Sequence, residues 1–271
     1  MYLTRHQTLE GPRWALDGNF LPRQFSLGML LELPASAFKG FLTAIPTETI
    51  AVGEVVAPIE PTQEVWASGV TYLRSRDARK AESNVGDVYE RVYDAERPEI
   101  FFKALGWRVK GHLTPIRIRQ DSHWNVPEPE LTLVINRQLE VVGFCVGNDV
   151  SSRSIEGENP LYLPQAKTYN GSCALGPGIR LASAGQIKDT PIRLEILRGG
   201  SPAFEGDIRS SQMKRSFEEL AAYLGRELDF PQGVFLMTGT GLVPPDTFSL
   251  QPGDVVRITV ADLLLENEVQ A

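Results

Sequence analysis

One stretch of the sequence predicts more of the fold than any other: EPELTLVINRQLEVVGFCVGNDVSSR, residues 128–153. An apolar run over 131–135 is followed by a polar turn at 136–138 and by a second apolar run over 141–146. Two short apolar runs separated by turn residues are typical of a β-hairpin. A hairpin returns the chain to its starting end, so we expect Asp149 to lie beside Glu128 and Glu130.

Glu128 and Glu130 are two residues apart, and in an extended strand this spacing points both side chains to the same face. Together with Asp149 they would form a metal site; the alternative is a solvated strand end with ordinary surface acids. The metal site is favoured because Pro127 and Pro129 stiffen the backbone, and because three close carboxylates without a cation would repel one another. All-oxygen ligands favour Mg²⁺, with Mn²⁺ or Ca²⁺ as alternatives.

Composition restricts the class of partner. The chain has 271 residues, of which 42% are hydrophobic, enough for one sizeable domain and a smaller one. Its net charge is -7, and no run of Lys or Arg is long enough to follow a phosphate backbone. We therefore expect a small-molecule partner, and neither nucleic acid nor membrane.

Cysteine content and the N-terminus predict the compartment. Cys145 and Cys173 are the two cysteines, too few for a disulfide framework, and we expect both to be reduced core thiols. The N-terminal residues lack an apolar signal core, and no segment approaches the roughly 18 apolar residues of a membrane span. These features predict a soluble, cytoplasmic protein.

Short strands with turns between them dominate the chain after residue 61, for example over 116–119, 192–196 and 255–260. The clearest helix begins at Ser216, which can form a capping box with Glu219. The regular alternation of strands and long helices that a doubly wound sheet requires is missing, so the fold class is α+β. The proline-punctuated segment 55–61 predicts a boundary between a small N-terminal α/β domain, residues 1–60, and a catalytic domain, residues 61–271.

From about residue 64 to residue 269 the chain resembles the fumarylacetoacetate hydrolase family. The matching pieces are RPEIFFK (97–103), the Glu128-x-Glu130-Leu131 pair, NDVSSR (148–153), Lys167, TGTG (238–241) and PGD (252–254). The resemblance implies a β-rich, mixed-sheet roll with a divalent cation, in which Glu128, Glu130 and Asp149 are the metal ligands and Lys167 is the active-site lysine. It also implies a homo-oligomer, either a homodimer or a homotetramer.

The chain departs from the hydrolases of this family at the residue that activates water. These hydrolases carry a histidine three residues after a tyrosine near the start of the catalytic domain, but here Tyr72 is followed at that position by Ser75. His6, His112 and His123 all lie outside the motif, and we expect them to be surface or packing residues. A water-activating base of the usual kind is therefore not predicted.

A narrower branch of the family fits the sequence better. The segments YLRSRDAR (72–79), SHWNVPEPE (122–130) and IEGENPLYLPQAK (155–167) are similar to those of the 2-dehydro-3-deoxy-pentonate dehydratases. This branch implies removal of water from 2-dehydro-3-deoxy-D-arabinonate, which is the same compound as 2-keto-3-deoxy-D-xylonate. The implied product is 2,5-dioxopentanoate, and the implied pathway is non-phosphorylating pentose oxidation.

The expected chemistry passes through a metal-stabilised enolate. A 2-oxo acid can chelate Mg²⁺, which acidifies the C3 protons, and the C4 hydroxyl can then leave. Two proton-handling groups are needed, and Lys167 and Glu99 are the candidates, with either one as the base. A neighbouring cation would favour the neutral form of Lys167. The alternatives are that Lys167 is an ion-pair partner of the metal carboxylates and that Glu99 is a surface acid.

Four further residues are candidates for substrate binding: Ser75, Arg76, Thr240 and Lys103. Ser75 and Arg76 occupy the place of the missing histidine motif, and Thr240 lies in a glycine-flanked turn. Lys103 follows an apolar run, so a buried structural pair is an equal alternative for it. The charge-rich residues 82–94 are predicted to form a lid over the substrate.

Other functions remain open at the level of sequence. An acylpyruvate (fumarylpyruvate-type) C-C bond hydrolase, a 2-oxo acid decarboxylase or a tautomerase would use the same Mg²⁺-enolate chemistry, because a fold does not determine a reaction. A non-catalytic sugar-acid binding protein that retains the metal site is an alternative of another class.

Overall fold

The structure is a computed structural model that describes residues 1–76 and 91–271. The predicted lid falls largely outside the described residues, which include only its last four positions. In chain order the strands are β1 (Tyr2–Thr8), β2 (Gly11–Leu16), β3 (Asn19–Phe20), β4 (Val55–Val56), β5 (Glu64–Gly69), β6 (Glu99–Leu105), β7 (Ile116–Arg117), β8 (Asn125–Val126), β9 (Pro129–Ile135), β10 (Val141–Asp149), β11 (Ser151–Ser152), β12 (Cys173–Leu181), β13 (Pro191–Arg198), β14 (Ser201–Arg209), β15 (Val234–Met237), β16 (Val255–Val260) and β17 (Leu263–Gln270).

Helices are short and few among the described residues. They include α1 (Leu27–Leu31), α2 (Ala35–Ala44), α5 (Arg153–Glu158), α6 (Leu163–Lys167), α7 (Ala184–Ile187) and α8 (Phe217–Leu224), with 3-10 turns η1 (Gly106–Arg108), η2 (Pro160–Tyr162) and η3 (Ser210–Gln212). Residues 73–76 and 91–94 are helical as well. The predicted helix after Ser216 is confirmed as α8, whose first turn Ser216 caps by accepting from Glu219 N. The Glu219 carboxylate accepts a hydrogen bond from Arg215 instead of from the Ser216 backbone. Of the two interactions of the predicted capping box, the serine interaction is the one formed.

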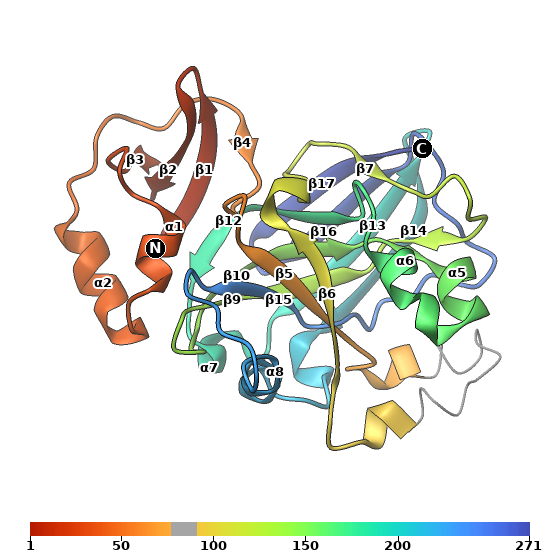
Figure 1. The fold of residues 1–271 in the computed structure, drawn as a ribbon. Coiled ribbons are helices and arrows are strands. Elements are labelled where there is room, and N and C mark those ends of the chain that lie inside the picture. The colour runs from red at the N-terminus through yellow and green to blue at the C-terminus, as the bar shows by residue number, and fades with distance from the viewer. Residues whose placement is uncertain (77–90) are drawn as a thin grey trace.

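Two sheets make up the body of the molecule (Figure 1). The large sheet has the strand order β3-β2-β1-β12-β10-β9-β15-β5-β6, with β4 beside β1, and the smaller sheet has the order β14-β13-β16-β17-β7. Most neighbours are antiparallel, whereas β15 runs parallel to β5 and β17 runs parallel to β7. The strand-rich α+β class with mixed sheets is therefore confirmed.

Two apolar cores lie on opposite faces of the large sheet. One core packs alternate residues of β9, such as Leu131 and Leu133, against β13, β16, β17 and α8. The other packs Val134 and Phe235 against the N-terminal helices, through residues such as Leu30. Strand β9 is consequently buried along its whole length, and any polar group that it carries is buried as well.

Residues 1–60 continue the large sheet, since β1 pairs antiparallel with β12 from Tyr2↔Arg180 to Thr4↔Gly178. Their helices α1 and α2 and strands β2 to β4 lie at one end of that sheet (Figure 1). The sheet thus crosses the expected boundary near residue 60 without interruption, and the division into two domains stays a prediction.

The large sheet also curls. Strand β6 stands four positions from β10 in the strand order, which is roughly 19 Å in a flat sheet. Nevertheless Lys103 Nζ, from β6, lies 2.5 Å from Asp149 Oδ1 at the end of β10. This curvature brings residues from distant strands to one point and produces the functional site.

Candidate metal centre and active-site pocket

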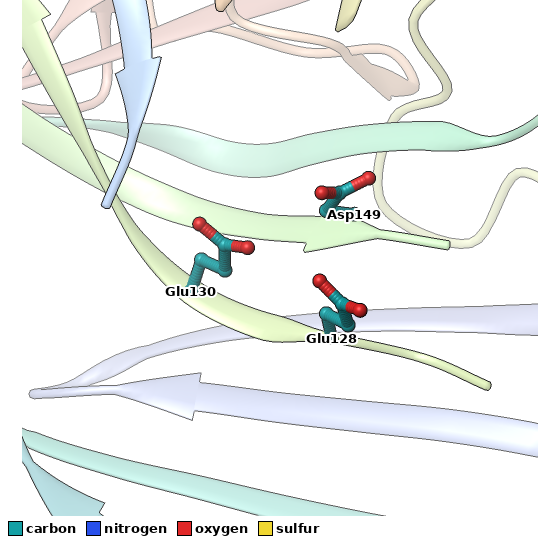
Figure 2. A group of neighbouring side chains, drawn as sticks. All are labelled: Glu128, Glu130 and Asp149. Carbon is teal, nitrogen blue, oxygen red and sulfur yellow. The ribbon is translucent and has the colours of Figure 1, made fainter. Parts of the chain in front are cut away.

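Strands β9 and β10 form the predicted hairpin, with Gly147 opposite Glu130. Asp149 is the last residue of β10, and its backbone N–H donates to the Glu128 carbonyl over 3.0 Å. One carboxylate oxygen from each of Glu128, Glu130 and Asp149 lies within 4.8 Å of the other two, and all three residues are buried. Figure 2 shows the three carboxylates gathered above the two strands. The sequence therefore predicted both the hairpin and the convergence of these side chains.

Both oxygens of the Glu128 carboxylate are held by neighbouring side chains. Its Oε1 accepts a hydrogen bond from Ser151 Oγ at 2.9 Å and lies 3.1 Å from an Arg153 guanidinium nitrogen. Its Oε2 is 2.8 Å from Lys167 Nζ. The Oε1 oxygen is thereby fixed by Ser151 of β11 and by Arg153 at the start of α5.

The two oxygens of the Asp149 carboxylate also contact different side chains. Its Oδ1 forms an ion pair with Lys103 Nζ at 2.5 Å, and its Oδ2 is 2.8 Å from Lys167 Nζ. Lys103 is fully buried, and its ammonium also donates to the carbonyls of Val150 and Lys167. Lys103 was expected either to bind substrate or to form a buried structural pair. The structure shows the buried pair, because the ammonium contacts Asp149 and two backbone carbonyls.

Glu130 is the least neutralised of the three carboxylates. Its Oε2 accepts from the Gly239 backbone N–H at 2.5 Å, whereas Oε1 has no hydrogen-bond partner among the described residues. Burial, followed by the charges of Asp149 and Glu128, raises the pKa of Glu130 well above its usual range. Gly239 adopts φ +90°, and a Cβ there would lie 2.1 Å from Thr71 Oγ1, so glycine is required to deliver this N–H.

These residues fit a divalent cation. An orphaned carboxylate oxygen and mutual repulsion among buried acids are both relieved by a cation placed between them. The donor set consists of oxygen atoms alone, which suits a hard cation such as Mg²⁺.

Lys167 lies at the end of α6, in contact with two of the three metal-ligand candidates. Its side chain is buried, and the ammonium is 5.5 Å from the centre of the Phe101 ring. The lysine therefore has the contacts expected of an ion-pair partner of Glu128 and Asp149, and it also faces the cavity that adjoins them.

A cavity of about 20 Å³ adjoins the carboxylates, with room for about one water molecule. Among its lining residues are six that the sequence had singled out: Ser75, Glu99, Glu128, Asp149, Lys167 and Thr240. They come from strands, helices and loops far apart in the chain. A five-carbon acid requires the side chains around this cavity to move apart.

Glu99 begins β6 directly opposite Gly69 of β5. A Cβ at Gly69 would lie 1.9 Å from Glu99 Oε2, so the carboxylate rests on backbone that only glycine leaves open. Glu99 is partly exposed in the described structure, and it lines the same cavity as Lys167.

The candidates for substrate binding separate into two groups. Ser75 and Thr240 line the cavity, although Ser75 Oγ donates to the Tyr72 carbonyl at 2.7 Å and Thr240 Oγ1 accepts from Leu242 N at 3.1 Å. Arg76 and Lys103 do not appear among the described lining residues. The Arg76 guanidinium lies 5.1 Å from the centre of the Tyr93 ring.

Sequence reasoning assigned no role to Glu156, which is buried and lines the cavity. Its Oε2 is 3.4 Å from an Arg153 nitrogen, one turn earlier on α5. The sequence signal was the i, i+3 spacing of the two residues within NDVSSRSIEGE, which alone does not distinguish a buried carboxylate from a surface pair.

The histidines are remote from the cavity, as predicted: none of the three lines it in the part of the chain that the structure describes. His6 contacts Thr4 Oγ1, and His112 accepts from the Glu266 backbone N–H. Burial lowers the pKa of His112, which favours this neutral acceptor role. The two cysteines are buried free thiols, and no helix among the described residues is long and apolar enough to cross a membrane.

A curled, strand-rich sheet with three buried carboxylates and an adjoining lysine is the arrangement of metal-dependent enzymes built on a β-roll. The family model for the fumarylacetoacetate (FAA) hydrolase C-terminal domain matches residues 64–270. The chain therefore belongs to the fumarylacetoacetate hydrolase family.

Two curated relatives share much of the sequence. One is a probable 2-keto-3-deoxyxylonate dehydratase of Haloferax volcanii, 48% identical over 212 residues, which are 76% of this chain and 72% of the relative. Another is a 2-dehydro-3-deoxy-D-arabinonate dehydratase of Saccharolobus solfataricus, 43% identical over 217 residues, which are 77% and 72% of the two chains.

A solved structure is similar over the full chain. It is 2-keto-3-deoxy-D-arabinonate dehydratase complexed with magnesium and 2,5-dioxopentanoate, with a TM-score of 0.84 and 32% identity. The alignment covers 100% of this chain and 99% of the solved chain. Residues 1–60, which the family model does not match, are therefore included in the structural likeness.

Proposed function

We propose that this protein is a Mg²⁺-dependent dehydratase that converts 2-dehydro-3-deoxy-D-arabinonate to 2,5-dioxopentanoate in non-phosphorylating pentose oxidation. The observation that carries the proposal is the buried cavity that joins Lys167 and Glu99 to the carboxylates of Glu128 and Asp149. Relatives that are 48% and 43% identical are named as dehydratases of this substrate class.

Glu128, Glu130 and Asp149 would hold the cation. When bound, Mg²⁺ supplies Lewis acidity, which polarises the 2-keto group and makes the C3 protons more acidic. A cation held by these residues would place the 2-oxo acid end of the substrate near Lys167, whose Nζ is 2.8 Å from oxygens of Glu128 and Asp149. The C3 and C4 atoms would then lie on the side of Glu99, which lines the same cavity.

The elimination requires one group to accept the C3 proton and another to protonate the departing C4 hydroxyl, which leaves as water. Lys167 and Glu99 are the two titratable candidates, and we assign the base role to the neutral form of Lys167. The unsaturated product becomes the aldehyde when C5 loses one carbon-bound proton and its hydroxyl proton, and C3 and C4 gain one proton each. Lys167 and Glu99 both line the cavity, so both are placed to transfer these protons.

Ser75 and Thr240 are proposed to contact the substrate, since both hydroxyls lie at the cavity wall. Each hydroxyl already makes two backbone hydrogen bonds, one as donor and one as acceptor, and retains a second acceptor lone pair. Arg76 and Lys103 are not among the described residues that line the cavity. For Lys103, the contact with Asp149 favours a role in positioning that carboxylate.

The competing reactions are less well supported. A hydrolase of this family would need a water-activating base, and Ser75 stands at the position of the usual histidine. A non-catalytic sugar-acid binding protein would have no need of a lysine and a glutamate facing one cavity. We also propose a cytoplasmic homo-oligomer, a dimer or a tetramer, whose mass light scattering can measure.

The test is product analysis by NMR in D₂O, with purified protein, Mg²⁺ and 2-dehydro-3-deoxy-D-arabinonate, and an acylpyruvate in a parallel tube. The dehydratase yields 2,5-dioxopentanoate with solvent deuterium at C3 and C4. Pyruvate released from the acylpyruvate, without any dehydration, would instead assign C-C bond hydrolysis.

A further inference from the structure

The three metal-ligand candidates share a feature that the spacing of the sequence does not reveal. In each carboxylate one oxygen is held by the protein: Glu128 Oε1 by Ser151 and Arg153, Glu130 Oε2 by the Gly239 N–H, and Asp149 Oδ1 by Lys103. The remaining oxygens of Glu128 and Asp149 both accept hydrogen bonds from Lys167 Nζ at 2.8 Å, whereas that of Glu130 has no hydrogen-bond partner among the described residues. Each carboxylate thus has one oxygen that is held by a group other than Lys167.

The number of oxygens that a carboxylate offers affects which cation it prefers. Mg²⁺ demands near-ideal octahedral geometry at about 2.0–2.1 Å, whereas Ca²⁺ takes about 6–8 oxygens and accepts bidentate carboxylates. A carboxylate whose second oxygen is held by a buried side chain is restrained from turning to bind through both oxygens. Three carboxylates that each bind through one oxygen would supply three ligands. This suits the octahedral shell of Mg²⁺ better than the larger shell of Ca²⁺.

We propose that the side chains that hold these second oxygens determine the cation selectivity of the centre. By keeping Asp149 and Glu128 monodentate, Lys103 and Ser151 favour Mg²⁺ over Ca²⁺. This inference rests on the metal site of the proposed function and adds to it the residues that select the metal.

Lys103 is the strongest of these supports because of where its ammonium lies. The side chain is fully buried, 2.5 Å from Asp149 Oδ1, and it donates to the Val150 carbonyl at 3.1 Å and the Lys167 carbonyl at 2.5 Å. The two carbonyls fix the ammonium against the backbone at the end of β10 and the end of α6. Lys103 is accordingly a positioning residue that fixes the side chain of Asp149 and the backbone of Lys167 together.

Ser151 provides a milder and better controlled change. Its hydroxyl donates to Glu128 Oε1, whereas the hydroxyl of the next residue, Ser152, donates to Ser122 Oγ at 2.7 Å. Both serines are fully buried in β11. Ser152→Ala is therefore a matched control that removes the same atom from the same strand without releasing a metal ligand.

The experiment measures the dissociation constants of Mg²⁺ and Ca²⁺ by isothermal titration calorimetry, without substrate, for the parent, Lys103→Met, Ser151→Ala and Ser152→Ala. The ratio of the two constants is the readout, because removal of the Lys103 charge strengthens both divalent cations alike and cancels in the ratio. We expect the parent to prefer Mg²⁺, and this preference to fall about tenfold in Lys103→Met and about threefold in Ser151→Ala. Ser152→Ala should keep the parent ratio.

Two results would overturn the proposal: a parent that prefers Ca²⁺ or binds neither cation, or a ratio within twofold of the parent in both test variants. If Lys103→Met does not fold, the ratio in Ser151→Ala decides alone. The proposed function is judged separately, since a parent that selects Mg²⁺ but fails to dehydrate the sugar acid refutes the reaction and leaves the selectivity intact.

Discussion

At the scale of single residues, Lys167 is central because its ammonium contacts oxygens of Glu128 and Asp149 while the side chain faces the cavity. An ion-pair partner and a proton-transfer group would make the same contacts with these two carboxylates. They differ in what their removal does to turnover when the cation is bound. The two roles can therefore be separated by experiment.

Lys167→Met should lower kcat by at least about 10²-fold with saturating Mg²⁺, because general acid–base groups contribute about 10²–10⁴-fold. Substrate binding should persist, since the three carboxylates that hold the cation are unchanged. Steady-state kinetics and calorimetric titration of the 2-oxo acid measure the two effects, and Lys188→Met, at an exposed lysine, is the control. Turnover within threefold of the parent would reduce Lys167 to an ion-pair partner.

The buried thiols and one tyrosine predict how stability depends on pH. Burial raises the pKa of Cys173 and that of Tyr2 to about 12. The folded state therefore keeps these protons at a pH where the unfolded chain has released them. Their stabilisation is complete below the unfolded values, roughly 8.5 for a thiol and 10 for a tyrosine, and is lost as pH rises toward 12.

The free energy of unfolding should accordingly fall above about pH 9, by up to roughly 1.4 kcal/mol per pH unit for the buried Cys173 thiol and by less for Tyr2, which is partly exposed. Urea titrations at pH 8, 9 and 10 measure this slope. Cys173→Ala should lose stability at all pH values and show a flatter slope than the parent. Equal slopes in the two proteins would mean that this thiol makes no contribution.

At the scale of elements, α1 depends on an acceptor that lies outside it. The Glu60 carboxylate accepts from the first-turn amides of Leu27 and Gly28, at 2.6 and 3.2 Å, and from Trp14 Nε1 at 3.1 Å. Helix N-termini leave such N–H groups without intrahelical partners, and an anion at that end is favoured. One side chain thus joins α1 and β2 to the segment that follows β4.

Glu60→Ala should lower the free energy of unfolding by about 2–4 kcal/mol, because it leaves these buried donors without their acceptor. Denaturant unfolding measures the loss. Glu54→Ala is the control, since that side chain is exposed, and it should change stability by less than about 0.5 kcal/mol. Equal effects at both positions would exclude the capping role.

At the scale of the whole molecule, metal binding and stability are linked. The centre concentrates three buried carboxylates, and the pKa of Glu130 is raised by burial and by the charges of its two neighbours. A cation that binds only the folded state adds RT ln(1 + [L]/Kd) to stability, about 2.7 kcal/mol at 100 times Kd. The protein without cation therefore folds against the repulsion among these groups.

Mg²⁺ at 100 times its Kd should raise Tm by roughly 5–10 °C, and EDTA should reverse the shift. Glu130→Gln should abolish the response to Mg²⁺, yet its Tm in EDTA should equal or exceed that of the parent, because a neutral amide avoids the burial and repulsion that raise the pKa of the Glu130 carboxyl. Differential scanning calorimetry measures both effects. A Glu130→Gln variant that still responds fully to Mg²⁺ would contradict the ligand assignment.

The site was predictable to the extent that it depends on local spacing. The apolar runs around a polar turn predicted the hairpin of β9 and β10, and the two-residue period placed Glu128 and Glu130 on one face. Glu99, Lys167 and Thr240 were identified through family resemblance, and the structure brings all three to the cavity. The buried position of Glu156 was missed, since helical spacing does not report which face packs inward.

The sequence by itself determined the class of the fold, the β-hairpin and the carboxylate triad, because strand periodicity and turn chemistry act over a few residues. Tertiary structure alone decided which oxygen of each carboxylate is held, and by what. Lys103 reaches Asp149 and the Lys167 carbonyl only because the large sheet curls between β6 and β10, which bridges sequence separations of 46 and 64 residues. Curvature is a collective property of many strands packed over two cores, and no short segment encodes it.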